Sequence, residues 1–181
     1  MRKFEEVTTE SKEIFKGKIV HLKVDTVTLP DGNTSKREII KHPGAVAVIA
    51  QKEDGKIIFV EQYRKALEKS VVEIPAGKLE EGEDPLVTAK RELEEETGYT
   101  TDNLQLINSF YTSPGFADEL VNVYFTDQLT KLEHNVAGDE DEFVELMELT
   151  LEEAEQLEKE QRIHDAKTSY ALLYLKIRGL K

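Results

Sequence analysis

The chain of 181 residues contains no cysteine and no tryptophan, and aromatic residues make up only 7% of it. Without cysteine it can form neither disulfides nor thiolate metal sites, and it has no thiol nucleophile. No apolar run is long enough for a signal-peptide core or a transmembrane helix, so we expect a cytoplasmic protein that does not bind membranes. The 39% of hydrophobic residues is still enough for one domain with a buried core.

Basic residues are also scarce. The 24 lysines and arginines face 37 aspartates and glutamates, which gives a formal net charge of −13 at pH 7. Because nucleic acids are bound by basic patches, this balance argues against a nucleic-acid partner. It would also repel a nucleotide substrate, so binding one would require metal ions and a few local arginines.

The most informative segment runs from Gly77 to Tyr99. Asp84 can cap a helix, Pro85 suits its first position, and Gly98 can end it with a positive φ. Between these signals, three apolar residues recur at helical spacing and predict a stripe that faces the core. They are Leu86, Ala89 and Leu93.

Glutamates lie beside this stripe. Glu92 and Glu96 are four residues apart, with Glu95 one step round, and at about 100° per residue Glu96 falls at the edge of the apolar face. A glutamate-rich helix is usually a solvated surface, but here a glutamate stands where a lysine or arginine would balance Glu92. A divalent cation would relieve the repulsion. Mg²⁺ binds carboxylates together with substrate phosphates, so the helix is a candidate platform for phosphate chemistry.

The same segment resembles the Nudix box, G-x5-E-x7-R-E-U-x-E-E-x-G-U, in which U is a bulky apolar residue. Every fixed position is matched, with Tyr99 an unusual choice for the last U; the matching residues are Gly77, Glu83, Arg91, Glu92, Leu93, Glu95, Glu96 and Gly98. Fixed spacing makes the pattern specific. The resemblance implies a metal-dependent hydrolase of nucleotide metabolism with an α/β (α+β) fold, the Nudix α/β/α sandwich with a mixed sheet.

The resemblance also assigns roles to residues. Glu92, Glu95, Glu96 and the carbonyl of Ala76 would hold Mg²⁺, or Mn²⁺, with more than one ion per site, and Glu92 and Glu96 would thereby take part in catalysis. The bound ions would neutralise a diphosphate and activate a water molecule. Glu83 and Arg91 would orient the carboxylates that bind metal.

A proline sixteen residues beyond Gly98, Pro114, resembles the mark of the ADP-ribose pyrophosphatase branch, which hydrolyses ADP-ribose to AMP and ribose 5-phosphate. Its substrate loop would contain Ser113, Gly115 and Glu119. In similar enzymes a glutamate of the acidic loop 131–141 or its end acts as general base, which makes Glu140 and Glu142 the candidates. On composition alone that stretch is simply a solvated loop.

Two arginines, Arg37 and Arg64, are candidates for clamping the phosphates. A lone arginine is more often a surface charge, but its planar fork binds two phosphate oxygens at once.

The N-terminal residues 1–41 alternate polar and apolar positions around a Pro-Asp-Gly-Asn turn and predict a small antiparallel sheet. So small a sheet cannot cover both of its faces. We therefore expect a dimerising segment, 1–41, and a Nudix hydrolase domain, 42–181. The chain would form a homodimer whose sites are shared between subunits, as in similar pyrophosphatases.

Further elements follow from local patterns. The apolar run 45–50 predicts a central strand with residues 56–63 as its hairpin partner, and 104–111, 121–125 and 143–149 read as strands. Thr150 begins a capping-box pattern that opens a helix through Lys159, and 169–177 is a second helix that faces the core.

Two other functions remain open. A Nudix pyrophosphatase for another nucleoside diphosphate derivative, a sugar nucleotide or a dinucleotide, would keep the box and change the outer pocket. A non-catalytic domain that senses a nucleotide is the other possibility. Such a domain can lose metal ligands, whereas here all of them are present, and no basic segment is left to bind DNA.

Overall fold

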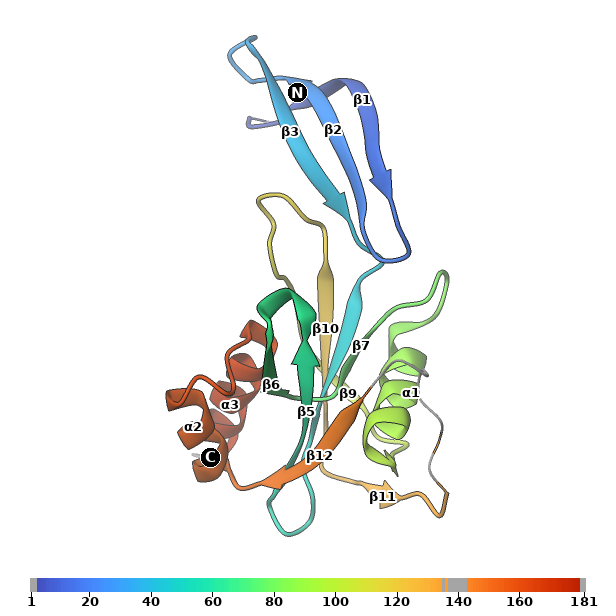
Figure 1. Cartoon of the computed structure of the whole chain (residues 1–181), viewed down its shortest axis with the longest axis vertical. Helices are drawn as coiled ribbons and strands as arrows, with labels where there is room; N and C mark the ends of the chain where they lie inside the picture. Colours follow the sequence, from blue (N-terminus) through green and yellow to red (C-terminus); the bar gives the residue numbers. More distant parts are fainter. Residues whose placement is uncertain (1–2, 135, 137–142, 180–181) are drawn as a thin grey trace. The chain divides into compact units, whose positions relative to one another are not determined.

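The computed structural model describes residues 3–134, 136 and 143–179 (Figure 1). Within them the chain forms two compact units. The N-terminal unit comprises residues of 1–44 and 110–120, and the main unit comprises residues of 45–109 and 121–181. None of the helices in the described residues is both long enough and apolar enough to cross a membrane.

The N-terminal unit contains the expected antiparallel sheet. Its strands are β1 (Val7–Lys16), β2 (His21–Thr28) and β3 (Thr34–Lys41), in the order β1-β2-β3. The turn between β2 and β3 closes with the Gly32 N–H donating to the Leu29 carbonyl over 2.9 Å. Gly32 has φ +86°, which a side chain would disfavour.

Much of this sheet remains uncovered within its own unit. Every residue of β1 is exposed, including Phe15 at 59%, whereas Val27 of β2 is buried. Residues 110–120 join the unit through the Ile40 N–H, which donates to the Phe116 carbonyl over 2.8 Å. The Asp118 carboxylate accepts from the His42 N–H over 2.8 Å and also binds Lys41.

The main unit is built on a mixed sheet of four strands. Their order is β7 (Ala76–Lys78), β4 (Ala45–Ala50), β10 (Leu120–Thr126) and β9 (Gln105–Tyr111). Strand β4 pairs in parallel with β10 and antiparallel with β7. Because both of its edges and both of its faces are covered, β4 is almost wholly buried, which confirms it as a central strand.

The predicted hairpin between residues 45–50 and 56–63 is wrong. Strand β5 (Ile57–Arg64) forms, but it belongs to a second, antiparallel sheet between β12 (Val144–Leu149) and β6 (Lys69–Glu73). Only a single bridge, Gln51 to Ile57, links the two runs. Both edges of β4 are taken by β7 and β10, so β5 must pair elsewhere.

Helices lie on both sides of these sheets, as the sandwich requires (Figure 1). Helix α1 (Pro85–Thr97) lies on one side, and α2 (Leu151–Lys159) and α3 (Ala166–Gly179) lie on the other. The remaining elements are short: η1 (Lys65–Leu67), β8 (Tyr99–Thr100) and β11 (Thr130–Lys131). The capping box of α2 is confirmed, with the Glu153 N–H donating to Thr150 Oγ1 over 3.2 Å.

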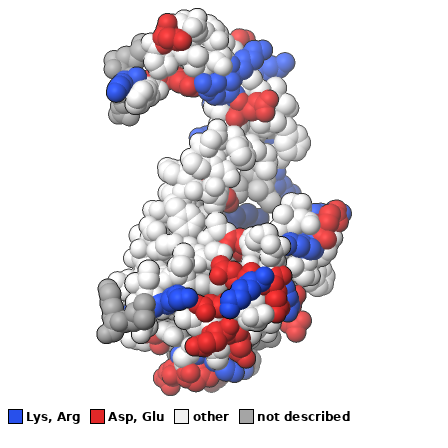
Figure 2. Space-filling view, turned by 90° about the vertical axis from the view of Figure 1, so that its left-hand side faces the viewer, with Lys and Arg blue, Asp and Glu red and all other residues white. Residues whose placement is uncertain are grey.

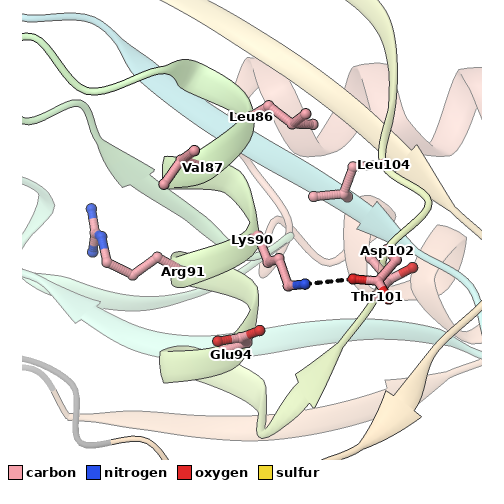
Figure 3. A pocket seen from close by; sticks show the side chains of 8 residues that line it. All are labelled: Leu86, Val87, Lys90, Arg91, Glu94, Thr101, Asp102 and Leu104. Atoms are coloured by element: carbon pink, nitrogen blue, oxygen red, sulfur yellow. Dashed lines mark hydrogen bonds and ion pairs between the residues drawn. The ribbon is translucent and has the colours of Figure 1, made fainter.

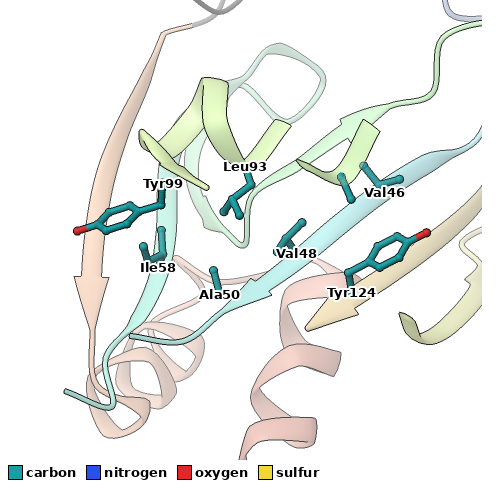
Figure 4. Close-up of a cluster of buried hydrophobic side chains, with 8 residues drawn as sticks. Val46, Val48, Ala50, Ile58, Leu93, Tyr99 and Tyr124 are labelled. Carbon is teal, nitrogen blue, oxygen red and sulfur yellow. The ribbon is translucent and has the colours of Figure 1, made fainter. Parts of the chain in front are cut away.

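The core beside α1 joins residues of this helix to β4 and β5 (Figure 4). Ala89 and Leu93 are fully buried, as their spacing predicted, but Leu86 is 46% exposed, so the predicted stripe begins one turn later. Leu86 lies in the first turn and lines a surface cavity instead. Tyr99 fits the core because its ring is buried while its hydroxyl donates to Glu148 Oε1 over 3.0 Å.

The acidic composition is visible on the surface. On the face shown in Figure 2, acidic side chains gather, with lysines and arginines among them. Pairs such as Lys176 Nζ with Glu155 Oε1, at 2.7 Å, compensate part of this charge. Exposed pairs of this kind contribute little to stability.

Candidate functional site

The ends of α1 are set by local signals. The Asp84 side chain accepts from the Leu86 N–H over 2.8 Å, Pro85 occupies the first position, and Gly98 ends the helix with φ +70°. The Gly98 N–H donates to the Glu94 carbonyl over 3.0 Å. These contacts confirm the predicted bounds and fix which way each glutamate of the helix points.

Two glutamates of α1 point into the protein. Glu92 and Glu96 are only 6% and 8% exposed. Glu96 Oε2 accepts from the backbone N–H of Ala76 over 2.9 Å, which ties the helix to β7. A Cβ on Gly77 would lie 1.9 Å from Glu92 Cδ, so only glycine allows this approach. The structure therefore brings together Ala76, Glu92 and Glu96.

Arg91 lies among the carboxylates of this cluster. Its Nη1 is 2.9 Å from Glu92 Oε1 and 2.8 Å from Glu95 Oε2, and its Nη2 is 3.4 Å from Glu83 Oε2. Burial alone would lower the pKa of Arg91, but the hydrogen bond with Glu83 and the charges of Glu92 and Glu95 raise it overall. Arg91 thus relieves part of the repulsion that the sequence predicted.

The donor atoms of these residues are carboxylate oxygens, which hard divalent cations prefer as ligands. Three carboxylates, those of Glu83, Glu92 and Glu95, share one guanidinium, which leaves an excess of negative charge. A fourth carboxylate, that of Glu96, binds the Ala76 N–H. The bare Gly77 leaves no side chain between Glu92 and β7. Within the described residues, no group of three or more His, Cys, Asp or Glu side chains is gathered closely enough to hold an ion. The donors are therefore of the right chemical type but are not gathered around one point, and Arg91 binds three of them.

A second charged group involves Arg64, at the end of β5. Its Nε and Nη2 bind the two oxygens of Glu73 over 3.1 and 2.6 Å. Lys167 Nζ, from α3, also binds Glu73, at 3.0 Å. Neither Glu73 nor Lys167 was predicted from the sequence as a site residue. The one available signal was a carboxylate ending the apolar run of β6.

Several predicted site residues belong to the N-terminal unit. Arg37 lies on β3 in the N-terminal unit, where its fork binds Glu6 over 2.8 and 2.6 Å. In the same unit, Glu119 binds the Thr112 hydroxyl and lies 3.7 Å from His42 Nε2, and the Ser113 carbonyl accepts from the Ala117 N–H over 2.9 Å.

Three predicted positions remain, Gly115, Glu140 and Glu142. A Cβ added to Gly115 would meet nothing within 4 Å. Glu140 and Glu142 lie outside the described residues, so their role as general base stays a prediction.

A cavity of about 420 Å³ lies beside α1, between the helix and the segment 101–104 (Figure 3). Leu86 and Leu104 line it, and Lys90 Nζ bridges to Asp102 Oδ1 over 2.7 Å. At about 100° per residue, Lys90 lies on the side of α1 opposite Glu92 and Glu96. The cavity is therefore separate from the acidic cluster, and Arg91 alone belongs to both.

Comparisons with known proteins agree with these observations. The family model of the NUDIX domain matches residues 41–172, and that of the nucleoside diphosphate sugar hydrolase N-terminal domain matches residues 6–40. The chain is 60% identical to the methanol dehydrogenase activator of Bacillus methanolicus, over 96% of this chain and 94% of that protein. It is 57% identical to the ADP-ribose pyrophosphatase of Bacillus subtilis (strain 168), over 98% and 96%.

A solved structure described as an ADP compounds hydrolase shares the fold with a TM-score of 0.82. It is 19% identical in sequence and covers 97% of this chain and 94% of its own. This likeness confirms the predicted fold class.

The close approach of β7 to Glu92 leads to a stability prediction. Gly77→Ala should lower the free energy of unfolding by about 1–3 kcal/mol, because the added methyl overlaps the Glu92 carboxylate and forces the strand and helix apart. Urea denaturation measures this difference. Gly179→Ala is the matched control, since a Cβ there meets nothing within 4 Å. Equal losses for both variants would refute the close approach.

Proposed function

The chain is a member of the Nudix family, and on this premise we propose that it hydrolyses the diphosphate of ADP-ribose to AMP and ribose 5-phosphate. The observation that carries the proposal is the acidic cluster of α1. Glu92 and Glu96 are buried against β7, and Arg91 pairs with Glu92 and Glu95. The similarity to a protein named ADP-ribose pyrophosphatase, over almost the whole chain, supports the choice of substrate.

Nudix hydrolases use divalent metal ions, and we propose Mg²⁺, with Mn²⁺ as the alternative and more than one ion per site. Glu92, Glu95, Glu96 and the Ala76 carbonyl would hold them. When bound, the ions neutralise the diphosphate and make water a better nucleophile. The Ala76 N–H orients Glu96.

The other residues bind substrate or move a proton. Arg91 orients Glu92 and Glu95 through its Nη1. Arg64 and Arg37 would bind phosphate oxygens, with Ser113, Gly115 and Glu119 forming a substrate loop. The attacking water gives its proton to Glu140 or Glu142, while the bond between the bridging oxygen and the attacked phosphorus breaks.

The metal-binding role of α1 predicts the effect of one neutral substitution. Glu96→Gln keeps the shape of the side chain and removes its charge, so kcat on ADP-ribose should fall by at least about a hundredfold. Glu81→Gln, an exposed position before the helix, is the control and should retain wild-type turnover. A substrate screen should compare ADP-ribose with sugar nucleotides, dinucleotides and nucleoside triphosphates. A compound among these that is hydrolysed with a higher kcat/KM would replace ADP-ribose as the proposed substrate.

The general-base assignment separates the two loop glutamates. If one of them accepts the proton, its change to Gln should slow single turnover by roughly 10²–10⁴, while the other variant stays near wild type. Glu133→Gln provides a control, since Glu133 is exposed earlier in the same connection. Two variants that both react at the wild-type rate would place the base elsewhere.

We also propose a homodimer with shared sites. Its support is the uncovered apolar surface of the N-terminal sheet, in particular Phe15, Ile14 and Val7. A two-fold pair is the commonest way to cover such a surface. Arg37 would then serve the partner's cleft. A cytoplasmic location likewise stays a proposal that rests on the sequence.

Subunit mixing tests the shared site. Arg37→Ala and Glu96→Gln should each be nearly inactive at low substrate concentration. In a mixed dimer one site would combine both intact residues, so an equal mixture should regain about a quarter of wild-type activity. No gain after subunit exchange would exclude sharing. A monomeric mass by light scattering at micromolar concentration would exclude the dimer.

A second candidate function follows from the relative described as a methanol dehydrogenase activator. The chain would then regulate a dehydrogenase, either through its hydrolytic activity or as a non-catalytic binding partner. Adding it to a purified alcohol dehydrogenase distinguishes these cases, because Glu96→Gln abolishes activation only if hydrolysis is required.

The family description of residues 6–40 keeps nucleoside diphosphate sugars as the alternative substrates.

A further inference from the structure

A buried carboxylate outside α1 holds one of the proposed phosphate-binding arginines. Glu73 ends β6, and its side chain is only 4% exposed. The Arg64 fork donates to it from Nε over 3.1 Å and from Nη2 over 2.6 Å. Two parallel hydrogen bonds to one carboxylate fix both the position and the plane of a guanidinium. Arg64 is therefore held in a defined orientation.

Helix α3 brings a second cation to the same carboxylate. Lys167 Nζ lies 3.0 Å from Glu73 Oε2 and 3.0 Å from Asp165 Oδ1. Asp165 Oδ1 also accepts from the Thr168 N–H over 3.1 Å, as a helix cap does. The buried Thr168 hydroxyl accepts from the Ile74 N–H over 3.2 Å. The first turn of α3 is thus tied to the end of β6, just before Ala76.

The charges of this group decide what Arg64 can do. A single arginine on a carboxylate makes a neutral pair, which attracts a phosphate weakly. Lys167 also binds Glu73, so two cations share that carboxylate, and Asp165 pairs with Lys167, which makes the four charges balance. Without Lys167 the group would carry a net negative charge. In the described part of the chain, the hydrogen bonds of Arg64 use Nε and Nη2, and none is made by Nη1.

The charge of Glu96, in the acidic cluster of α1, also acts on Arg64. The hydrogen bond with Glu73 raises the pKa of Arg64 against the opposing effect of burial, and the charge of Glu96 raises it further. Arg64 therefore interacts electrostatically with Glu96, the carboxylate that we propose binds metal. A diphosphate held by metal at Glu96 would lie within the field of this guanidinium.

We propose that Glu73 and Lys167 are positioning residues for substrate binding. Glu73 fixes the Arg64 fork, and Lys167 neutralises Glu73 so that Arg64 keeps its attraction for a substrate phosphate. The proposal rests on the function proposed above and adds to it two residues that do not touch the substrate themselves.

Lys167→Met tests the charge while keeping much of the side-chain volume. It should raise KM for ADP-ribose about tenfold and change kcat less than about twofold, because the lost attraction acts on binding. Lys167→Arg should restore KM. Lys176→Met is the matched control on the same helix, where the lysine pairs with the partly exposed Glu155 at the surface. A fall in kcat at unchanged KM would overturn the proposal.

A double-mutant cycle shows whether Lys167 acts through Arg64. If it does, Arg64→Ala combined with Lys167→Met should have the same KM as Arg64→Ala alone. Multiplied effects on KM would mean that Lys167 acts independently and would overturn the proposal.

Arg64→Lys provides a second test if Lys167→Met does not fold. The Arg64 side chain is 41% exposed, so its substitution should disturb folding less. This variant keeps the charge but cannot form the fork, so its KM should approach that of Arg64→Ala. Wild-type KM would overturn the role of Glu73. If the substrate screen favours another nucleoside diphosphate derivative, the same KM ratios measured with that compound decide, so an error in the substrate does not hide an error here.

Discussion

The packing of Glu92 against the bare Cα of Gly77 is the contact on which the site depends. It lets α1 approach β7 so closely that the Ala76 N–H reaches Glu96. A buried carboxylate is costly unless it is hydrogen-bonded or paired, and these contacts, with Arg91 at Glu92, compensate that cost. Strand, helix and charges are therefore interdependent, and the acidic cluster they form is the feature that suits hydrolysis of a diphosphate.

The distribution of cations follows from the strongly acidic composition. With a net charge of −13, the protein as a whole repels a nucleotide, so a nucleotide can be attracted only locally, by arginines close to the site. Arg91, Arg64 and Arg37 each bind carboxylates. Such pairing fixes a guanidinium in place but reduces its attraction for phosphate, which makes a second cation such as Lys167 significant.

Much of the fold and part of the site could be predicted from local signals. The capping residues Asp84 and Gly98 indicated the bounds of α1, Thr150 indicated the start of α2, and the apolar run 45–50 marked the central strand. These predictions succeeded because caps, turns and hydrophobic runs act over a few neighbouring residues. The resemblance likewise implied that Arg91 orients metal-binding carboxylates, and its contact with Glu95, four residues on, follows from helical spacing.

The sequence by itself determined the three helices, the N-terminal sheet, the central strand and the family, because each depends on residues that are close together in the chain. Tertiary structure alone decided that β5 joins a second sheet and that Leu86 is exposed. It also decided that Glu73 receives Arg64 and Lys167, the latter 94 residues away. Strand pairing depends on which strand edges are already occupied, and the contact of Lys167 with Glu73 depends on which helix end packs against β6. Both are properties of the folded chain that local sequence patterns do not predict.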